Sequence, residues 1–147
     1  MKPVDSEERV RAPVAIVEPS PEGARRLASA YWREVERTTG GLVRVSRSPD
    51  GVALRALGAT LLRFGLPHIE FSDDRVSCSY PIEGGLLAGR PGGSIAFQQE
   101  GTVLISSISG FHPRLGILPG LYSHVQARLH MPVSRHYFAR LVREGAR

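Results

Sequence analysis

The stretch SGFHPRLGILPGLYSHVQARLH, from Ser109 to His130, contains the transition that decides the fold. Its first residues end a run with strand-like alternation, and the proline and glycine residues that follow permit a sharp bend. Beyond Gly120, apolar residues recur every three or four positions, which is typical of an amphipathic helix. This apolar stripe consists of Tyr122, Val125, Leu129, Val133, Tyr137 and Leu141. So much apolar surface requires a partner, and the sequence predicts that the helix packs on a sheet.

The opposite side of this predicted helix is basic, because His124, Arg128 and Arg135 fall there. Pro132 removes the backbone hydrogen bond to the carbonyl of Arg128 and therefore predicts a kink. Two interpretations of the helix are open at this point. It is either a lid over an apolar interior or a basic face for an acidic partner.

Upstream of this stretch, apolar and polar residues alternate, and turn signals recur at intervals of about eight to twelve residues, as in an antiparallel meander. The predicted strands are Leu42–Arg47, Val52–Leu57, His68–Ser72, Arg75–Ile82, Ser94–Gln99 and Thr102–Phe111. In Arg75–Ile82 one face carries only apolar residues: Val76, Cys78, Tyr80 and Ile82. The sequence therefore predicts a sheet with one buried and one wet face.

A strand and a helix precede the meander. Val14–Glu18 is predicted as the first strand, and Ser20 is a suitable N-cap for a helix with Pro21 and Glu22 in its first turn. The apolar stripe of that helix is Ala24, Leu27, Ala28, Tyr31 and Val35, and Gly40 with Gly41 ends it. Residues 1–12 are polar and of mixed charge, so a flexible tail is expected there, followed by a single domain over residues 13–147.

Two glycine-containing segments are harder to interpret. Gly58–Pro67 is too apolar for an exposed loop, but its glycines and proline interrupt a strand pattern, so we expect a folded-over loop at the mouth of the sheet. Glu83–Gly93 lacks the Gly-Lys-Ser/Thr of a phosphate-binding loop and precedes a strand rather than a helix. It is interpreted as a flexible hairpin connection.

The composition is that of an ordinary globular protein, with 41% hydrophobic and 22% charged residues among 147. No apolar run approaches the roughly 20 residues that cross a bilayer, and the first residues do not resemble a signal peptide, so a cytoplasmic location is expected. Cys78 is the only cysteine. It is predicted to be a small core side chain, because it has no partner for an internal disulfide or a cysteine-based metal cluster.

The net charge of +5 is concentrated at the C-terminal end. Residues 1–100 hold 13 basic and 13 acidic side chains, whereas residues 101–147 hold six arginines and one glutamate. We interpret this excess as a solvated face without specific nucleic-acid binding. Weak contact with an anionic surface through Arg128 and Arg135 remains open.

Candidate catalytic and metal-binding residues are few. His68 and Glu70 share one strand face, but an exposed polar edge explains them better than an acid/base pair. His124, His130 and His136 follow one another at steps of six, which places successive rings about 240° apart on a helix, so they do not form a zinc site. No Gly-x-Ser-x-Gly elbow is present. The sequence assigns no catalytic residue, and neither a metal nor a cofactor is expected.

The order of strand, helix, six antiparallel strands and long C-terminal helix resembles the START and polyketide-cyclase superfamily with its helix-grip fold. The resemblance includes the passage from VLISSISGFHPRLG into LYSHVQARLHMPVSRHYFARL and extends roughly from Pro13 to Arg143. It implies an α+β fold in which a curved antiparallel sheet of about six to seven strands wraps around the C-terminal helix. It also implies a cavity between them, without universal catalytic residues.

These inferences together favour non-catalytic binding of a small apolar or amphipathic molecule, such as a lipid or polyketide-like compound, in that cavity. The candidate ligand-lining residues are Tyr31, Trp32, Tyr80, Phe97, Gln99, Tyr122, Gln126 and Leu129. The aromatic members are more simply explained as core side chains. Two alternatives remain: a cyclase or aromatase using the same cavity, and a basic-surface adaptor for nucleic acid or an anionic membrane.

Overall fold

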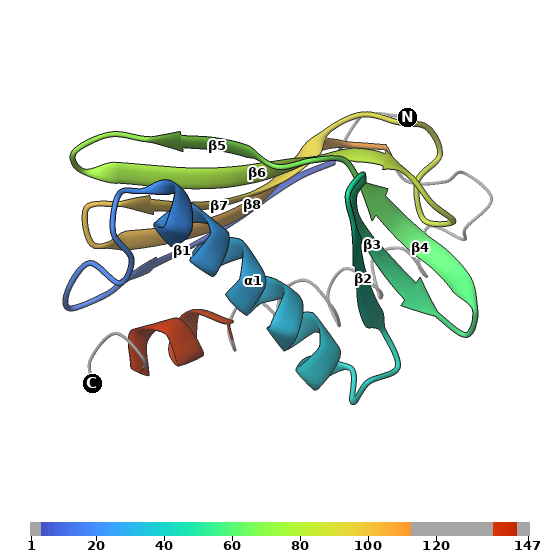
Figure 1. The fold of residues 1–147 in the computed structure, drawn as a ribbon, viewed down its shortest axis with the longest axis horizontal. Helices are drawn as coiled ribbons and strands as arrows, with labels where there is room; N and C mark the ends of the chain where they lie inside the picture. Colours follow the sequence, from blue (N-terminus) through green and yellow to red (C-terminus); the bar gives the residue numbers. More distant parts are fainter. Residues whose placement is uncertain (1–3, 113–136, 144–147) are drawn as a thin grey trace.

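The computed structural model describes residues 4–112 and 137–143, and their architecture is α+β (Figure 1). In the described residues, eight strands form one antiparallel sheet in the order β1-β8-β7-β6-β4-β3-β2, with β5 pairing to β6. The strands are β1 (Val4–Arg11), β2 (Arg44–Ser48), β3 (Gly51–Ala56), β4 (Ala59–Phe64), β5 (His68–Phe71), β6 (Arg75–Gly84), β7 (Ser94–Glu100) and β8 (Val103–Phe111). The sheet is strongly bent, because β2, β3 and β4 turn sharply from the direction of β5 to β8 (Figure 1).

Helix α1 (Pro21–Thr38) packs on the inner face of this sheet. The Ser20 side chain accepts a hydrogen bond from the backbone N–H of Gly23 at 3.1 Å and so caps the helix as predicted. Every residue of the predicted apolar stripe is buried: Ala24, Leu27, Ala28, Tyr31 and Val35. Gly40 and Gly41 adopt positive φ angles directly after the helix. The sequence-based prediction of this helix and its ends is confirmed.

The hairpins of the predicted meander are confirmed. β2 pairs with β3, β5 with β6 and β7 with β8, each antiparallel and each close to the predicted boundaries. Along β6, buried and partly exposed residues alternate as expected, with Val76, Cys78, Tyr80 and Ile82 on the buried face. Cys78 is fully buried, as predicted for a small core side chain.

The expectation of a flexible tail over residues 1–12 is wrong for residues 4–11, which form β1 along the edge of β8. The physical reason is that an edge strand pairs through its backbone on one side only, and it tolerates charged side chains facing water. Its outer positions, Asp5, Glu7, Arg9 and Arg11, are exposed. Polarity alone therefore does not distinguish this strand from a tail.

Val14–Glu18, predicted as the first strand, is not a strand in the structure. It is an irregular segment leading to α1, with Ile16 and Val17 buried. The prediction is wrong because a buried irregular segment and a strand share the same short apolar pattern.

Gly58–Pro67, expected to be a folded-over loop, contains strand β4. Gly58 lies in the turn before β4, and Gly65 lies at a bend where a Cβ atom would approach the Glu83 side chain to 2.6 Å. The backbone N–H of Gly65 donates to the carbonyl of Pro81 at 2.9 Å, so the chain remains attached to β6 through the bend. Glycine here permits close approach, and it does not end the sheet pairing.

The segment Glu83–Gly93 joins β6 to β7, as predicted, although its first two residues are the end of β6, and hydrogen bonds fix it against its neighbours. The backbone N–H groups of Leu86 and Leu87 donate to the carbonyls of Thr60 and Leu61, both at 3.0 Å. This connection therefore extends the pairing of β4, where the sequence suggested a flexible loop.

A helical segment over residues 137–143 lies beside α1 on the same side of the sheet (Figure 1). Its Tyr137, Phe138 and Leu141 side chains are buried in the core. The α+β fold class with a curved antiparallel sheet, one helix after the first strand and a C-terminal helix is thus confirmed. Pro132, the basic side of the predicted long helix and the first four residues of its apolar stripe lie outside the described residues.

Candidate ligand-binding site

Four of the predicted lining residues form one aromatic cluster beneath the sheet. Tyr31 and Trp32 come from α1, Tyr80 from β6 and Phe97 from β7. The Tyr31 and Phe97 ring centroids are 4.6 Å apart, and Trp32 lies 5.5 Å from Tyr80 and 5.7 Å from Phe97. Most of these pairs have the edge-to-face geometry that aromatic rings prefer. The sequence therefore identified residues that meet in space.

The sheet register and the helix face bring these rings together. Phe97 pairs with Cys78 across β6 and β7, and Tyr80 pairs with Ile95 one inward-facing position further along. Tyr31 and Trp32 are consecutive in α1. Both are buried because α1 buries residues over a wide part of its circumference. The Trp32 ring is thus inserted between helix and sheet.

Two further aromatic residues belong to the cluster, although they were not among the predicted lining residues. Phe64 lies 5.2 Å from Trp32, and Tyr137 lies 5.4 Å from Tyr31 and 6.1 Å from Phe97. Phe64 was missed because its segment was not recognised as a strand. Tyr137 belongs to the predicted apolar stripe, and this stripe was the signal that could have identified it.

The aromatic cluster contains buried polar atoms with few hydrogen-bond partners of good geometry. Among the described residues, the buried Trp32 indole Nε1 has no hydrogen-bond acceptor in good geometry. Burial raises the pKa of the Tyr80 hydroxyl, and the neighbouring Cys78 thiol raises it further, whereas the nearby Trp32 indole N–H opposes the rise. Burial also raises the pKa of the Cys78 thiol. At neutral pH the cluster therefore contains neutral polar groups and a poorly satisfied donor.

Tyr137 closes the cluster from the C-terminal side. Burial raises the pKa of its hydroxyl well above the usual value of 10.0, with smaller contributions from Tyr31 and Cys78. The ring is almost completely buried. Helix residues 137–143 thus complete the apolar interior rather than lying on the surface.

A buried carboxylate attaches this C-terminal segment to α1. Glu34 is only 2% exposed, and its Oε1 accepts hydrogen bonds from Arg37 at 3.1 Å and from Arg140. Both arginines are partly exposed, so their remaining donors can reach solvent. The buried charge is therefore paired twice, as a buried carboxylate requires.

Gln99, another predicted lining residue, is buried but bonded to the backbone that precedes α1. Its Oε1 accepts from the N–H groups of Ile16 at 2.8 Å and Val17 at 3.1 Å, and its Nε2 donates to the carbonyl of Val17 at 2.8 Å. This amide supports the irregular segment, and we do not include it in the proposed site. Tyr122, Gln126 and Leu129 lie outside the described residues.

His68 and Glu70 are exposed on the outer face of β5. His68 Nε2 lies 2.9 Å from Glu70 Oε1, and both side chains are about 70% exposed. This is the solvent-facing polar edge that the sequence favoured. Within the described part of the chain, no three side chains of the metal-ligating types gather into a possible metal site.

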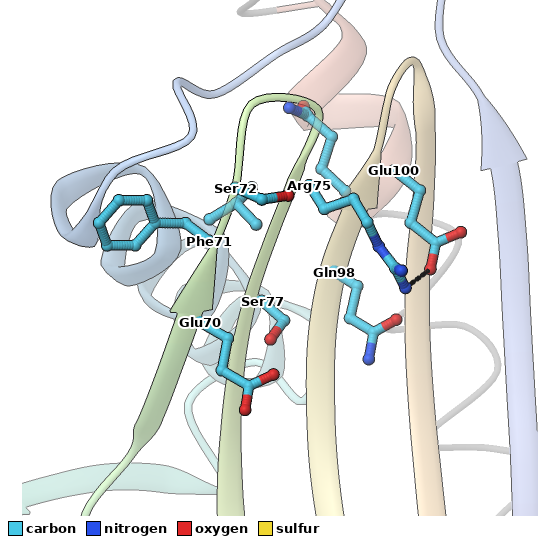
Figure 2. A pocket seen from close by; sticks show the side chains of 9 residues that line it. Glu70, Phe71, Ser72, Arg75, Ser77, Gln98 and Glu100 are labelled. Atoms are coloured by element: carbon cyan, nitrogen blue, oxygen red, sulfur yellow. Dashed lines mark hydrogen bonds and ion pairs between the residues drawn. The ribbon is translucent and has the colours of Figure 1, made fainter.

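A shallow depression of about 260 Å³ lies on the outer face of β5, β6 and β7 (Figure 2). Glu70, Ser77 and Gln98 line its floor, and Arg75 pairs with Glu100 at its rim at 2.7 Å. The Phe71 ring points away from these polar side chains (Figure 2). The depression is shallow and lined largely by polar side chains, whereas the aromatic cluster is apolar and buried.

The described residues define an α+β protein of helix-grip type, with one bent antiparallel sheet over two helical segments and an aromatic cluster between them. No family model matches the sequence, and neither does any curated protein. No helix in residues 4–112 or 137–143 is long and apolar enough to cross a bilayer.

Comparison with solved structures gives several distant similarities. The crystal structure of Ara h 8.0201 matches at 14% identity and a TM-score of 0.47, covering 95% of this chain and 97% of that one. TTHA0849 from Thermus thermophilus matches at 17% identity and a TM-score of 0.46, covering 97% and 96%. The Aha1 dimer from Colwellia psychrerythraea matches at 14% identity and a TM-score of 0.40, covering 86% and 91%.

Proposed function

We propose that this protein binds a small apolar or amphipathic molecule between the inner face of the sheet, α1 and the C-terminal helix. The observation that carries the proposal is the buried Trp32 indole nitrogen, which lies near the Tyr80 hydroxyl but makes no hydrogen bond of good geometry among the described residues. A buried donor without a partner costs free energy, and native proteins rarely leave one unless a ligand or water satisfies it. A ligand oxygen placed at Trp32 Nε1 supplies that acceptor.

The surrounding groups define what such a ligand offers. Its apolar body packs against the Tyr31, Trp32 and Phe97 rings, and burial contributes about 25 cal/mol per Å² of apolar surface. A carbonyl, ether or hydroxyl oxygen accepts from Trp32, and the neutral Tyr80 hydroxyl provides a second polar contact. No charged ligand group is needed, because among the described residues the cluster contains no ionised side chain. The proposal is binding without chemistry.

Native mass spectrometry of the purified protein tests the proposal directly. We expect a retained apolar molecule that organic extraction releases. Trp32→Phe preserves an aromatic ring but removes the donor, so it should lower ligand retention, and Phe138→Leu should serve as a control because Phe138 packs on Tyr137 at the edge of the cluster. If the protein retains nothing, and apolar probes bind equally to the parent and the Trp32→Phe variant, the proposal is wrong.

The predicted cyclase or aromatase alternative uses the same site and makes a different prediction for the ligand. A binding protein releases its ligand chemically unchanged. An enzyme of that kind releases a cyclised product that has a new carbon–carbon bond and has lost water. Mass analysis of the extracted compound before and after incubation with fresh protein separates the two. Tyr122, Gln126 and Leu129, which lie outside the described residues, remain proposed lining residues on the sequence pattern alone.

A further inference from the structure

The open end of the β2–β3 hairpin carries two exposed leucines and two arginines. We call Leu42, Arg44, Arg55 and Leu57 the hairpin end. Arg44 and Arg55 are directly opposite one another in the β2–β3 register. Leu42 precedes Arg44 by two residues and Leu57 follows Arg55 by two, so both leucines lie beyond the same end of the pair. Leu42 is 59% exposed and Leu57 is 92% exposed.

Leu57 occupies a backbone conformation that leucine disfavours. It has a φ of 52°, and it is the only described residue other than glycine with a positive φ. Together with Gly58, whose φ is 78°, it forms the two-residue turn between the paired residues Ala56 and Ala59. Such turns favour asparagine followed by glycine, because asparagine tolerates the left-handed region. A nearly fully exposed leucine contributes little to the packing of the described residues, which points to a role in a contact beyond them.

Neither arginine has an acidic partner among the described residues. Like charges directly opposite one another in an antiparallel pair are destabilising. No carboxylate in the described ranges lies within 4.0 Å of Arg44 or Arg55. Arg55 donates to the Thr60 hydroxyl at 2.9 Å and to the Gly58 carbonyl at 3.2 Å, which holds its guanidinium beside the turn. Its other N–H donors are available to an anion.

The turns on which the leucines lie project from the molecule. A Cβ atom added to Gly40, Gly41 or Gly58 would meet no other atom within 4 Å. Figure 1 shows the corresponding hairpins as an arm that extends from the rest of the sheet. Two leucines on separate projecting turns do not form a groove for a helix or peptide, but both are suited to insertion into a fluid apolar phase.

We propose that the hairpin end docks on a membrane surface that contains anionic lipids. Each leucine lies two positions beyond an arginine, in the turn that adjoins the end of the strand. Arg44 and Arg55 would contact lipid phosphates while Leu42 and Leu57 enter the acyl boundary. The proposal is independent of the ligand site, because no residue is shared between them.

Vesicle sedimentation with the full-length protein tests this surface. We expect binding to vesicles of phosphatidylcholine mixed with phosphatidylserine, and much weaker binding to phosphatidylcholine alone. Arg55→Gln should lower the affinity about fivefold. Leu57→Asn should lower it about tenfold, yet it should melt at the same temperature as the parent protein or higher, because asparagine suits the turn. Leu66→Asn is the matched control, since Leu66 is 61% exposed outside the hairpin end, and its binding should be unchanged.

Four outcomes would overturn the proposal. Equal binding to both vesicle types would exclude recognition of anionic lipid. Complete competition by soluble glycerophosphoserine would indicate a site for a free phosphate group. Binding to a DNA duplex that needs Arg44 and Arg55 but not Leu57, without vesicle binding, would assign the surface to nucleic acid. Vesicle binding that persists in a variant combining Leu57→Asn with Arg55→Gln would place the contact elsewhere.

Discussion

At the residue scale, Gln99 determines whether the segment before α1 stays attached to the sheet. Its side chain makes three hydrogen bonds to the backbone of Ile16 and Val17, and all of these groups are buried. Gln99→Leu keeps a similar volume but leaves two N–H groups and one carbonyl unsatisfied. We expect it to lower the free energy of unfolding by about 3 kcal/mol or more, measured by urea denaturation.

The neighbouring Gln98 is a matched control, because its side chain faces the outer surface of the sheet and lines the depression there. Gln98→Leu should change stability by less than about 0.5 kcal/mol. Similar losses in both variants would contradict the structural role assigned to Gln99.

Buried titrating groups predict how stability changes in alkali. Burial raises the folded-state pKa values of Cys78, Tyr80 and Tyr137 above their usual values of 9.0 for Cys and 10.0 for Tyr. The stability that these buried neutral groups contribute is fully present at pH values below their usual pKa. It is lost as the pH rises through them toward the folded-state pKa, because the unfolded chain then releases protons that the folded chain retains. Between its usual and its folded-state pKa, each group lowers the free energy of unfolding by about 1.4 kcal/mol per pH unit.

Tyr137→Phe separates one of these groups from the rest. This variant should lose stability less steeply than the parent protein above about pH 10, while Cys78→Ala should reduce the part of the loss that begins near pH 9.0. Urea denaturation across this pH range provides the measurement. Parallel stability profiles for the parent and Tyr137→Phe would show that Tyr137 is accessible to hydroxide in the folded state.

Sequence reasoning at this scale succeeded where pattern and burial coincide. The alternation around Cys78 and Tyr80 and the helical stripe containing Tyr31 correctly predicted which side chains meet in the core. It could not assign Gln99, because a buried amide fits a ligand and a backbone segment equally well until the partner is known. Nor could it identify the Glu34 interaction, since Glu34 and Arg140 are 106 residues apart.

At the scale of elements, the first turn of α1 is fixed by a close approach rather than by helix propensity. A Cβ atom on Gly23 would lie 1.9 Å from the carbonyl oxygen of Glu18. Alanine normally stabilises a helix relative to glycine by about 1 kcal/mol. Here Gly23→Ala should instead destabilise the protein by about 1–3 kcal/mol, because the preceding backbone must move.

Ser29→Ala is the control within the same helix, at a half-buried position. It should be neutral or slightly stabilising, by about 0.5 kcal/mol at most. Thermal melting of both variants measures the difference. A more stable Gly23→Ala protein would contradict the tight packing of Glu18 against this turn.

The elements that sequence analysis missed share a physical cause. β1 is polar because it is an edge strand. β4 is apolar but lies between Gly58 and Gly65, and the chain bends after it, so its pattern resembled a loop. In both cases the strand is specified by its neighbour, β8 for β1 and β3 for β4. The β2–β3 hairpin carries its own turn signal and was predicted correctly, whereas the β3–β4 hairpin turns through Leu57 and Gly58, without the asparagine that such turns favour.

At the scale of the whole molecule, three parts of the chain enclose the apolar interior. The sheet provides the curved roof, α1 covers much of its inner face, and residues 137–143 fill the remaining side through Tyr137 and Leu141. The Glu34 carboxylate joins the two helical segments through Arg37 and Arg140. The interior is therefore completed by residues from both ends of the domain, so folding and formation of the proposed ligand site are coupled.

Leu141 and Arg143 test this closure in the intact chain, because they lie two residues apart on opposite sides of the same helical segment. Leu141 is 0% exposed, whereas Arg143 is exposed. Leu141→Asp forces an unpaired charge into the core and should cost about 4 kcal/mol or more. Arg143→Asp should cost less than about 1 kcal/mol, because Arg143 is exposed. We expect only Leu141→Asp to bind an apolar dye and melt without cooperativity. Equal stability of the two variants would show that the C-terminal segment is a dispensable surface helix rather than a lid.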